Sequence, residues 1–196
     1  MPEITVNRRS NETDISLVLN IYGQGKYQIN SGCGFFDHML ELFAAHGRFD
    51  LTLSCVGDTQ VDYHHSIEDI GICLGRAFSQ SLGDRAGINR YGSMILPMDE
   101  ALVLSAVDIS GRDFCRVDLQ FSSAKIGDFN VELIEEFWMA FARQLGISIH
   151  ISQMAGINNH HIAEAVFKGM GRALRIAVAK DESLCGQIPS TKGTIL

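Results

Sequence analysis

The chain has 196 residues, of which 46% are hydrophobic, and a formal charge of −7 at pH 7. This length suits one domain or two small halves packed together, and the acidic balance without a basic stripe argues against a nucleic-acid partner. No apolar run approaches the roughly 18 residues that span a bilayer. The N-terminus has no signal-peptide pattern, and the five cysteines lack CxxC spacing, so we expect a reduced, cytoplasmic protein without a membrane partner.

The first part of the chain predicts strands followed by helices. Apolar and polar residues alternate over 15–21, the period of a half-buried strand, whereas 35–45 and 65–82 carry apolar residues at helical spacing. The elements expected here are a strand over 15–21, a short strand over 26–29, a helix over 35–45, a strand over 51–55 and a helix over 65–82.

The second part predicts the same order of elements. We expect two strands within 94–108, another over 114–119, a helix over 130–145, a strand over 147–151 and a helix over 159–179. His38 lies 26 residues before His64, and Glu136 lies 24 residues before His160. These matched spacings predict an internal duplication, with α+β halves at 1–90 and 91–196 that form one compact unit.

Each half contains one His-His-x-x-Glu motif, at 64–68 and at 160–164. The first His and the Glu are four residues apart, so on a helix they lie one above the other and can bind the same ion. The second His, His65 or His161, points about 100° away and is therefore aimed at a different ion. Two motifs predict two metal sites with crosswise ligands, suited to Mn²⁺, Fe²⁺ or Zn²⁺.

A purely structural role is the alternative interpretation of each of these histidines. A His-His pair can cap a helix or fill a polar surface, and His38 can be a capping or packing residue. The repetition of the motif, and the matching distance from His38 to His64, favour the metal-ligand interpretation. His46 and His150 have no comparable partner, and we take them as ordinary polar residues.

A phosphate site is the second feature that the sequence suggests. Binding a phosphate requires cations that converge, and the candidates are Arg90, Arg112, Ser190 and Lys192, although each alone can also be a solvated surface residue. The chain has neither a P-loop nor a strand-linked GxGxxG pattern, so a nucleotide is not indicated. A metal store, a metal sensor or a structural metalloprotein would explain the His/Glu motifs but not this basic set.

Several motifs in order resemble a known family, the imidazoleglycerol-phosphate dehydratases of histidine biosynthesis. The resemblance covers essentially the whole chain. The segments that carry it are 9–13 (RSNET), 34–40 (GFFDHML), 62–69 (DYHHSIED), 87–92 (GINRYG), 98–102 (MDEAL), 108–112 (DISGR), 159–168 (NHHIAEAVFK) and 188–193 (IPSTKG).

The resemblance implies a fold and an assembly. The fold would be α+β, with two similar duplicated halves, each a four-stranded sheet backed by helices. The assembly would be a homo-oligomer of 24 subunits built from trimers, with active sites between subunits. The implied cofactors are two Mn²⁺ ions per active site, or other divalent transition ions, and the implied substrate is a small phosphorylated imidazole that is dehydrated to imidazole-acetol phosphate.

The resemblance also implies which residues bind the metals. One ion would be held by His38, His64, Glu68 and His161. The other would be held by His65, His160, Glu164 and a residue of the helix before the last strand. Many members have His at that last position, whereas this chain has Glu136, with Glu135 as a rival.

The remaining roles follow from the same resemblance. Arg90, Arg112, Ser190 and Lys192 match phosphate-binding positions, and Glu12 would contact the substrate hydroxyls. Glu164 is the expected base or proton shuttle, with Glu68 as its counterpart in the other half.

Overall fold

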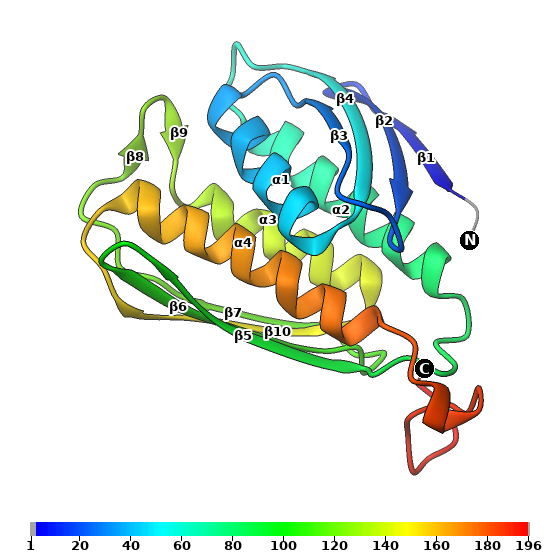
Figure 1. The fold of residues 1–196 in the computed structure, drawn as a ribbon. Helices are drawn as coiled ribbons and strands as arrows, with labels where there is room; N and C mark the ends of the chain where they lie inside the picture. Colours follow the sequence, from blue (N-terminus) through cyan, green and yellow to red (C-terminus); the bar gives the residue numbers. More distant parts are fainter. Residues whose placement is uncertain (1–2, 196) are drawn as a thin grey trace.

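Four helices lie between two β-sheets in the computed structural model, which describes residues 3–195. Figure 1 shows the layers in order as the first sheet, helices α1 and α2, helices α3 and α4, and the second sheet. The expected α+β class, with a four-stranded sheet backed by helices in each half, is confirmed.

The first sheet and its helices are formed by residues 4–82. The elements are β1 (Ile4–Arg9), β2 (Thr13–Asn20), β3 (Tyr27–Asn30), α1 (Gly34–Gly47), β4 (Asp50–Gly57) and α2 (His64–Leu82). The strand order is β1-β2-β4-β3, with β3 parallel to β4 and the other neighbours antiparallel. Strand β2 follows its alternating pattern: Ile15, Leu17 and Leu19 are buried, whereas Asp14 and Ser16 face solvent.

The second sheet repeats this topology. The elements are β5 (Tyr91–Met98), β6 (Ala101–Asp108), β7 (Phe114–Asp118), β8 (Lys125–Ile126), β9 (Phe129–Asn130), α3 (Leu133–Leu145), β10 (Ser148–Ala155), α4 (Asn159–Val178) and a 3₁₀ turn (Glu182–Leu184). The strand order is β5-β6-β10-β7, and β7 runs parallel to β10. The order of strands in the two sheets is therefore the same, as an internal duplication requires.

The helices of the two halves pack crosswise in the centre of the molecule. Helix α1 packs against α4, and α2 packs against α3. The core between them is aromatic: Phe36, Phe137, Trp138 and Phe167 are completely buried, with ring centroids 5.1 Å apart for Phe36 and Phe137. Each helix thus buries one face against the sheet of its own half and another face against a helix of the opposite half.

Two elements differ from the sequence-based expectation. Strand β1 was not expected, and residue 130, expected to begin a helix, lies instead in the β8–β9 hairpin, so that α3 begins at Leu133. The strands of this hairpin are two residues each, too short for alternation to reveal them. Phe129 anchors the hairpin because it is buried against Phe35, with ring centroids 4.9 Å apart.

Among the described residues, the helices lack the combination of length and apolar character needed to cross a membrane.

Candidate functional site

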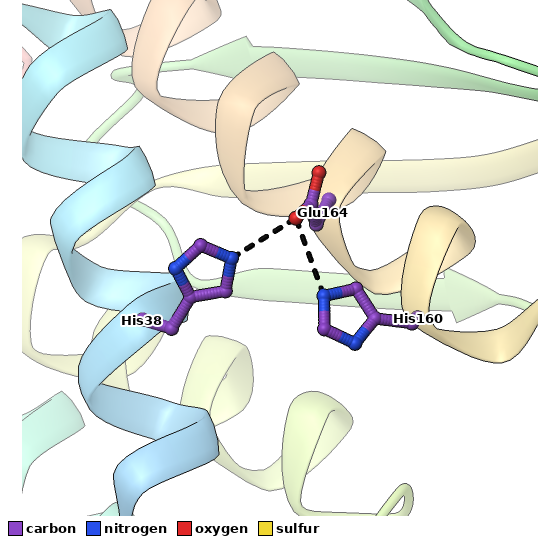
Figure 2. A group of neighbouring side chains, drawn as sticks. All are labelled: His38, His160 and Glu164. Carbon is purple, nitrogen blue, oxygen red and sulfur yellow. Dashed lines mark hydrogen bonds and ion pairs between the residues drawn. The ribbon is translucent and has the colours of Figure 1, made fainter.

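A first group of possible metal ligands joins α1 to α4. It consists of His38, His160 and Glu164, whose ligand atoms all lie within 4.8 Å of one another. The Nε2 atoms of His38 and His160 lie 2.9 Å and 3.2 Å from the same carboxylate oxygen, Oε1 of Glu164 (Figure 2). The helical spacing of four stacks His160 above Glu164, and the packing of α1 on α4 brings His38 to them.

A second group joins α2 to α3. It consists of His64, Glu68 and Glu136, again with all ligand atoms within 4.8 Å of one another. His64 and Glu68 are stacked by the same four-residue spacing, and Glu136 approaches from α3. Glu135, the rival for this position, is an exposed residue outside the group.

Within one chain, the two groups differ from the ligand sets that the resemblance implies. His38 was expected beside His64 and Glu68, but it lies with the second motif, whereas Glu136 lies with the first motif rather than with Glu164. The physical reason is the crosswise helix packing: α1 contacts α4, and α3 contacts α2. Each group therefore combines a motif from one half with one residue from the other half.

The first turns of the motif helices are fixed by polar side chains that precede the histidines. Asp62 Oδ1 accepts a hydrogen bond from the backbone N–H of His64 at 2.7 Å. Asn158 caps α4 by accepting from the backbone N–H groups of His160 and His161. These contacts satisfy N–H groups that a helix start leaves free, so the position of each motif is built into its sequence.

The second histidine of each motif is turned toward a carboxylate outside both groups. His65 Nδ1 lies 3.0 Å from Asp58 Oδ2, and His161 Nδ1 lies 2.7 Å from Glu100 Oε2. These hydrogen bonds raise the pKa of both imidazoles, and the bond with His161 lowers the pKa of Glu100 to about 2. A His whose Nδ1 is held in this way presents Nε2 as its free ligand atom. Glu12 Oε1 lies 3.9 Å from Nε2 of His65.

Glu164 is the most constrained carboxylate of the two groups. Its side chain is only 10% exposed, and Lys168 Nζ donates to its second oxygen, Oε2, at 2.7 Å. Burial raises the pKa of Glu164, but the hydrogen bonds from Lys168 and His38 outweigh that effect and lower the pKa to about 2. The carboxylate is therefore ionised at neutral pH.

Sequence reasoning gave no role to Lys168, Asp58 or Glu100. The four-residue step from Glu164 to Lys168 on one helix was a usable signal. Asp58 and Glu100 carried no such signal. Asp58 lies in a loop 7 residues before His65, outside the helix, and Glu100 lies 61 residues before His161, so only the tertiary fold brings each carboxylate to its His.

The predicted phosphate-binding residues do converge. Arg90, Arg112, Ser190 and Lys192 line one cavity of about 270 Å³, together with Tyr91, Ser110, Thr191, Thr194 and Ile195. Arg90 is oriented by Asp108, whose two carboxylate oxygens lie 2.7 Å and 3.2 Å from its guanidinium nitrogens. A third guanidinium nitrogen, Nη1, donates to Pro189 O at 2.9 Å, so all three nitrogens hold Arg90 in place. Its positive charge beside Arg112 and Lys192 suits a phosphate.

This cavity and the first metal-ligand group lie at opposite ends of α4. His160 is in the first turn, whereas the backbone N–H of Arg90 donates to Ala177 O near the last residue of the helix. Twenty residues of α-helix measure about 30 Å. Within one chain the two features are therefore well separated.

The fold and the site define a duplicated α+β protein with paired His/carboxylate groups and a separate cationic pocket. Residues 31–174 match the family model for imidazoleglycerol-phosphate dehydratase. The chain belongs to this family, and it is a hydro-lyase that dehydrates imidazole glycerol phosphate to imidazole-acetol phosphate in histidine biosynthesis.

Curated relatives agree with that assignment. An imidazoleglycerol-phosphate dehydratase of Desulforamulus reducens is 52% identical over 188 residues, which cover 96% of this chain and 95% of the relative. One from Rhodopseudomonas palustris (strain BisB5) is 49% identical over 195 residues, covering 100% of this chain and 99% of the relative. The enzyme assignment expected from the resemblance is confirmed.

Solved structures agree on the fold. The dehydratase of Staphylococcus aureus has 36% identity and a TM-score of 0.83, covering 92% of this chain and 100% of that one. The Pyrococcus furiosus enzyme, solved in complex with (S)-C348, has 40% identity and a TM-score of 0.84, covering 96% of this chain and 99% of that one.

Proposed function

We propose that the dehydratase works with two divalent metal ions per active site, Mn²⁺ foremost, bound by the two His/Glu groups. Each group offers three ligand atoms within 4.8 Å of one another, a separation that one ion can bridge. Imidazole and carboxylate ligands without thiolate suit Mn²⁺ and similar ions. Bound there, the ions would supply positive charge that stabilises a deprotonated imidazole ring and a substrate hydroxyl oxygen.

His65 and His161 would complete the coordination from neighbouring subunits. Each ring is held at Nδ1 by a carboxylate, Asp58 or Glu100, and within residues 3–195 neither ring belongs to a His/Glu group. A carboxylate on the far nitrogen is the usual partner of a metal-bound imidazole, because it fixes the tautomer and the ring orientation.

The substrate phosphate would bind in the cavity lined by Arg90, Arg112, Ser190 and Lys192. A substrate with one ring and three carbons is far shorter than α4, so the phosphate and the imidazole cannot reach both ends of the helix in one chain. The active site would therefore lie between subunits. This requirement supports the homo-oligomer expected from the resemblance, a 24-mer built from trimers.

Proton transfer would fall to the carboxylates. Dehydration removes a hydroxyl from the carbon attached to the ring and a proton from the next carbon, which leaves an enol that tautomerises to the ketone. Glu164 is ionised and would accept that proton and pass it to the departing hydroxide, forming water. Glu68 would be its counterpart in the other half, and Glu12 would contact the substrate hydroxyls.

A cytoplasmic location fits the chemistry of the cysteines. Cys33, Cys55, Cys73, Cys115 and Cys185 are all free thiols. Free thiols are usual where the environment is reducing, and three of the five are buried, where they act as small apolar residues.

The role of Glu164 can be tested with the Mn²⁺-loaded, assembled protein and imidazoleglycerol phosphate. Glu164→Gln should lower the rate of ketone formation by about 10²- to 10⁴-fold, the usual contribution of a general acid–base group, while the protein stays folded. Glu182→Gln, an exposed residue of the 3₁₀ turn, is the matched control. Activity of Glu164→Gln within a few-fold of the control would remove Glu164 from this role, and absence of turnover in the metal-loaded control would contradict the proposed site as a whole.

A further inference from the structure

The two metal-ligand groups occupy equivalent positions in the two halves but do not contain the same residues. His64 and Glu68 of α2 correspond to His160 and Glu164 of α4. The third member comes from the crosswise helix, and there the halves differ: α1 supplies His38, whereas α3 supplies Glu136. One group therefore has two imidazoles and one carboxylate, and the other has one imidazole and two carboxylates.

A second difference reinforces the first. Lys168 Nζ lies 2.7 Å from Glu164 and offsets the charge of that carboxylate. The residue four positions after Glu68 is Ile72, which carries no charge. Among residues 3–195, Glu68 and Glu136 form no ion pair with a Lys or Arg. The α2/α3 group thus keeps two uncompensated negative charges, whereas the charges of Glu164 and Lys168 cancel.

We propose that the two metal centres are unequal, and that Glu136 makes the α2/α3 centre the one that retains Mn²⁺ against Zn²⁺. The inference rests on the proposed function, in which both groups hold a divalent ion. Carboxylate oxygens suit hard ions such as Mn²⁺ and Mg²⁺, whereas imidazole nitrogens favour Zn²⁺ and other later transition ions. An imidazole donated to each centre by a neighbour would leave the difference of one carboxylate unchanged.

The inequality also predicts an order of loading. Two uncompensated carboxylates attract a divalent cation more strongly than one carboxylate paired with an ammonium group. When Mn²⁺ is limiting, the α2/α3 centre should fill first. The α1/α4 centre, with two imidazoles and Lys168 beside Glu164, should fill second and exchange its ion more readily.

The test is a Zn²⁺ titration of the assembled protein loaded with Mn²⁺. Released Mn²⁺ is followed by electron paramagnetic resonance, and both metals bound to the protein are counted by mass spectrometry. We expect two steps of displacement, the second at a Zn²⁺ concentration about tenfold or more above the first. Glu136→His should bring the second step down toward the first, with only the effect of Lys168 still separating them. Glu135→His, a change at the exposed neighbouring residue, should leave both steps in place.

A reciprocal variant, changed at the α1/α4 centre, means that the test does not depend on Glu136→His alone. His38→Glu should shift the first step to higher Zn²⁺, because it gives the α1/α4 centre the ligand set of its counterpart; this variant decides the question if Glu136→His fails to fold. A single step in the unaltered protein, or two unchanged steps in Glu136→His, would overturn the inference. Failure of the unaltered protein to bind two Mn²⁺ ions per chain would instead contradict the proposed function.

Discussion

At the scale of single residues, a carboxylate fixes the orientation of the second histidine of each motif, His65 or His161. Glu100 accepts from His161 Nδ1 and also from the backbone N–H of Asn158, at 2.7 Å and 2.9 Å. It therefore fixes both the ring and the loop that begins α4. Asp58 holds His65 in the same manner in the other half. Both contacts act on the orientation of Nε2, which is the atom proposed to bind metal in a neighbouring subunit.

Glu100→Ala should weaken metal binding by about 10- to 100-fold, the usual cost of losing a carboxylate behind a metal-bound imidazole. The ring of His161 loses its hydrogen-bond acceptor, and the loop before α4 loses its anchor. Competition with a metal chelator measures the affinity directly. Asp113→Ala, at an exposed position away from both motifs, provides the comparison, and equal affinities for the two variants would contradict the assigned role.

At the scale of secondary-structure elements, glycines set how closely the helices approach. A Cβ at Gly75 of α2 would lie 2.6 Å from the backbone oxygen of Phe141 on α3, and a Cβ at Gly171 of α4 would lie 2.6 Å from that of Phe43 on α1. Distances below 3.0 Å force the backbones apart. These two glycines occupy matching places, eleven residues after the first His of each motif, so each helix pair that carries a ligand group depends on one.

Gly75→Ala should destabilise the protein by about 1–3 kcal/mol, because it overpacks a close helix contact, and should weaken metal binding at the α2/α3 group by moving Glu136 away from His64. Chemical unfolding and metal titration measure the two effects. Gly34→Ala is the matched control, since no atom of the described part of the chain lies within 4 Å of its added Cβ. A stable Gly75→Ala protein with ordinary metal binding would show that this contact does not position the group.

The β8–β9 hairpin also helps to position the starts of the two motif helices. The hydroxyl of Tyr63, just before His64, donates to Asp128 at 2.8 Å. Asn159, just before His160, donates to Ser123 Oγ at 2.8 Å. The hairpin and the residues just before it therefore contact the start of both motif helices, and the hairpin lies at the end of the helical layers where α4 begins (Figure 1).

At the scale of the whole molecule, the separation of the phosphate cavity from the first ligand group makes a prediction about mixed assemblies. Arg112→Ala removes a cavity cation, and Glu164→Gln removes the proposed base, so each protein alone should be nearly inactive. If the active site lies between subunits, co-assembly of the two proteins should restore about a quarter of the activity, because a random site combines an intact group with an intact cavity at that frequency.

The mixing experiment needs the two proteins to be dissociated and reassembled together. Each protein taken through the same treatment by itself is the control. Activity of the mixture that stays at the level of the separate proteins would indicate that one chain supplies both parts of its own site, contrary to the proposal.

Much of the fold was predictable because its periodicities are local. The alternation in β2 and the apolar faces of α2 and α4 are each set by residues within one element. The repeated motif and its spacing predicted the duplication, and the basic segments around Arg90 and Lys192 predicted a cavity whose lining residues do converge. Strand β1 and the β8–β9 hairpin were not predicted, because short or weakly patterned segments become strands only through pairing with their neighbouring strands.

By itself the sequence determined which residues of each motif lie together, because helical spacing joins His64 to Glu68 and His160 to Glu164 wherever those helices lie. Only the tertiary structure decided how the sets combine. It paired α1 with α4 and α2 with α3, and so placed His38 in one group and Glu136 in the other. Contacts between helices far apart in the chain depend on packing of whole faces, and no local pattern specifies which face meets which.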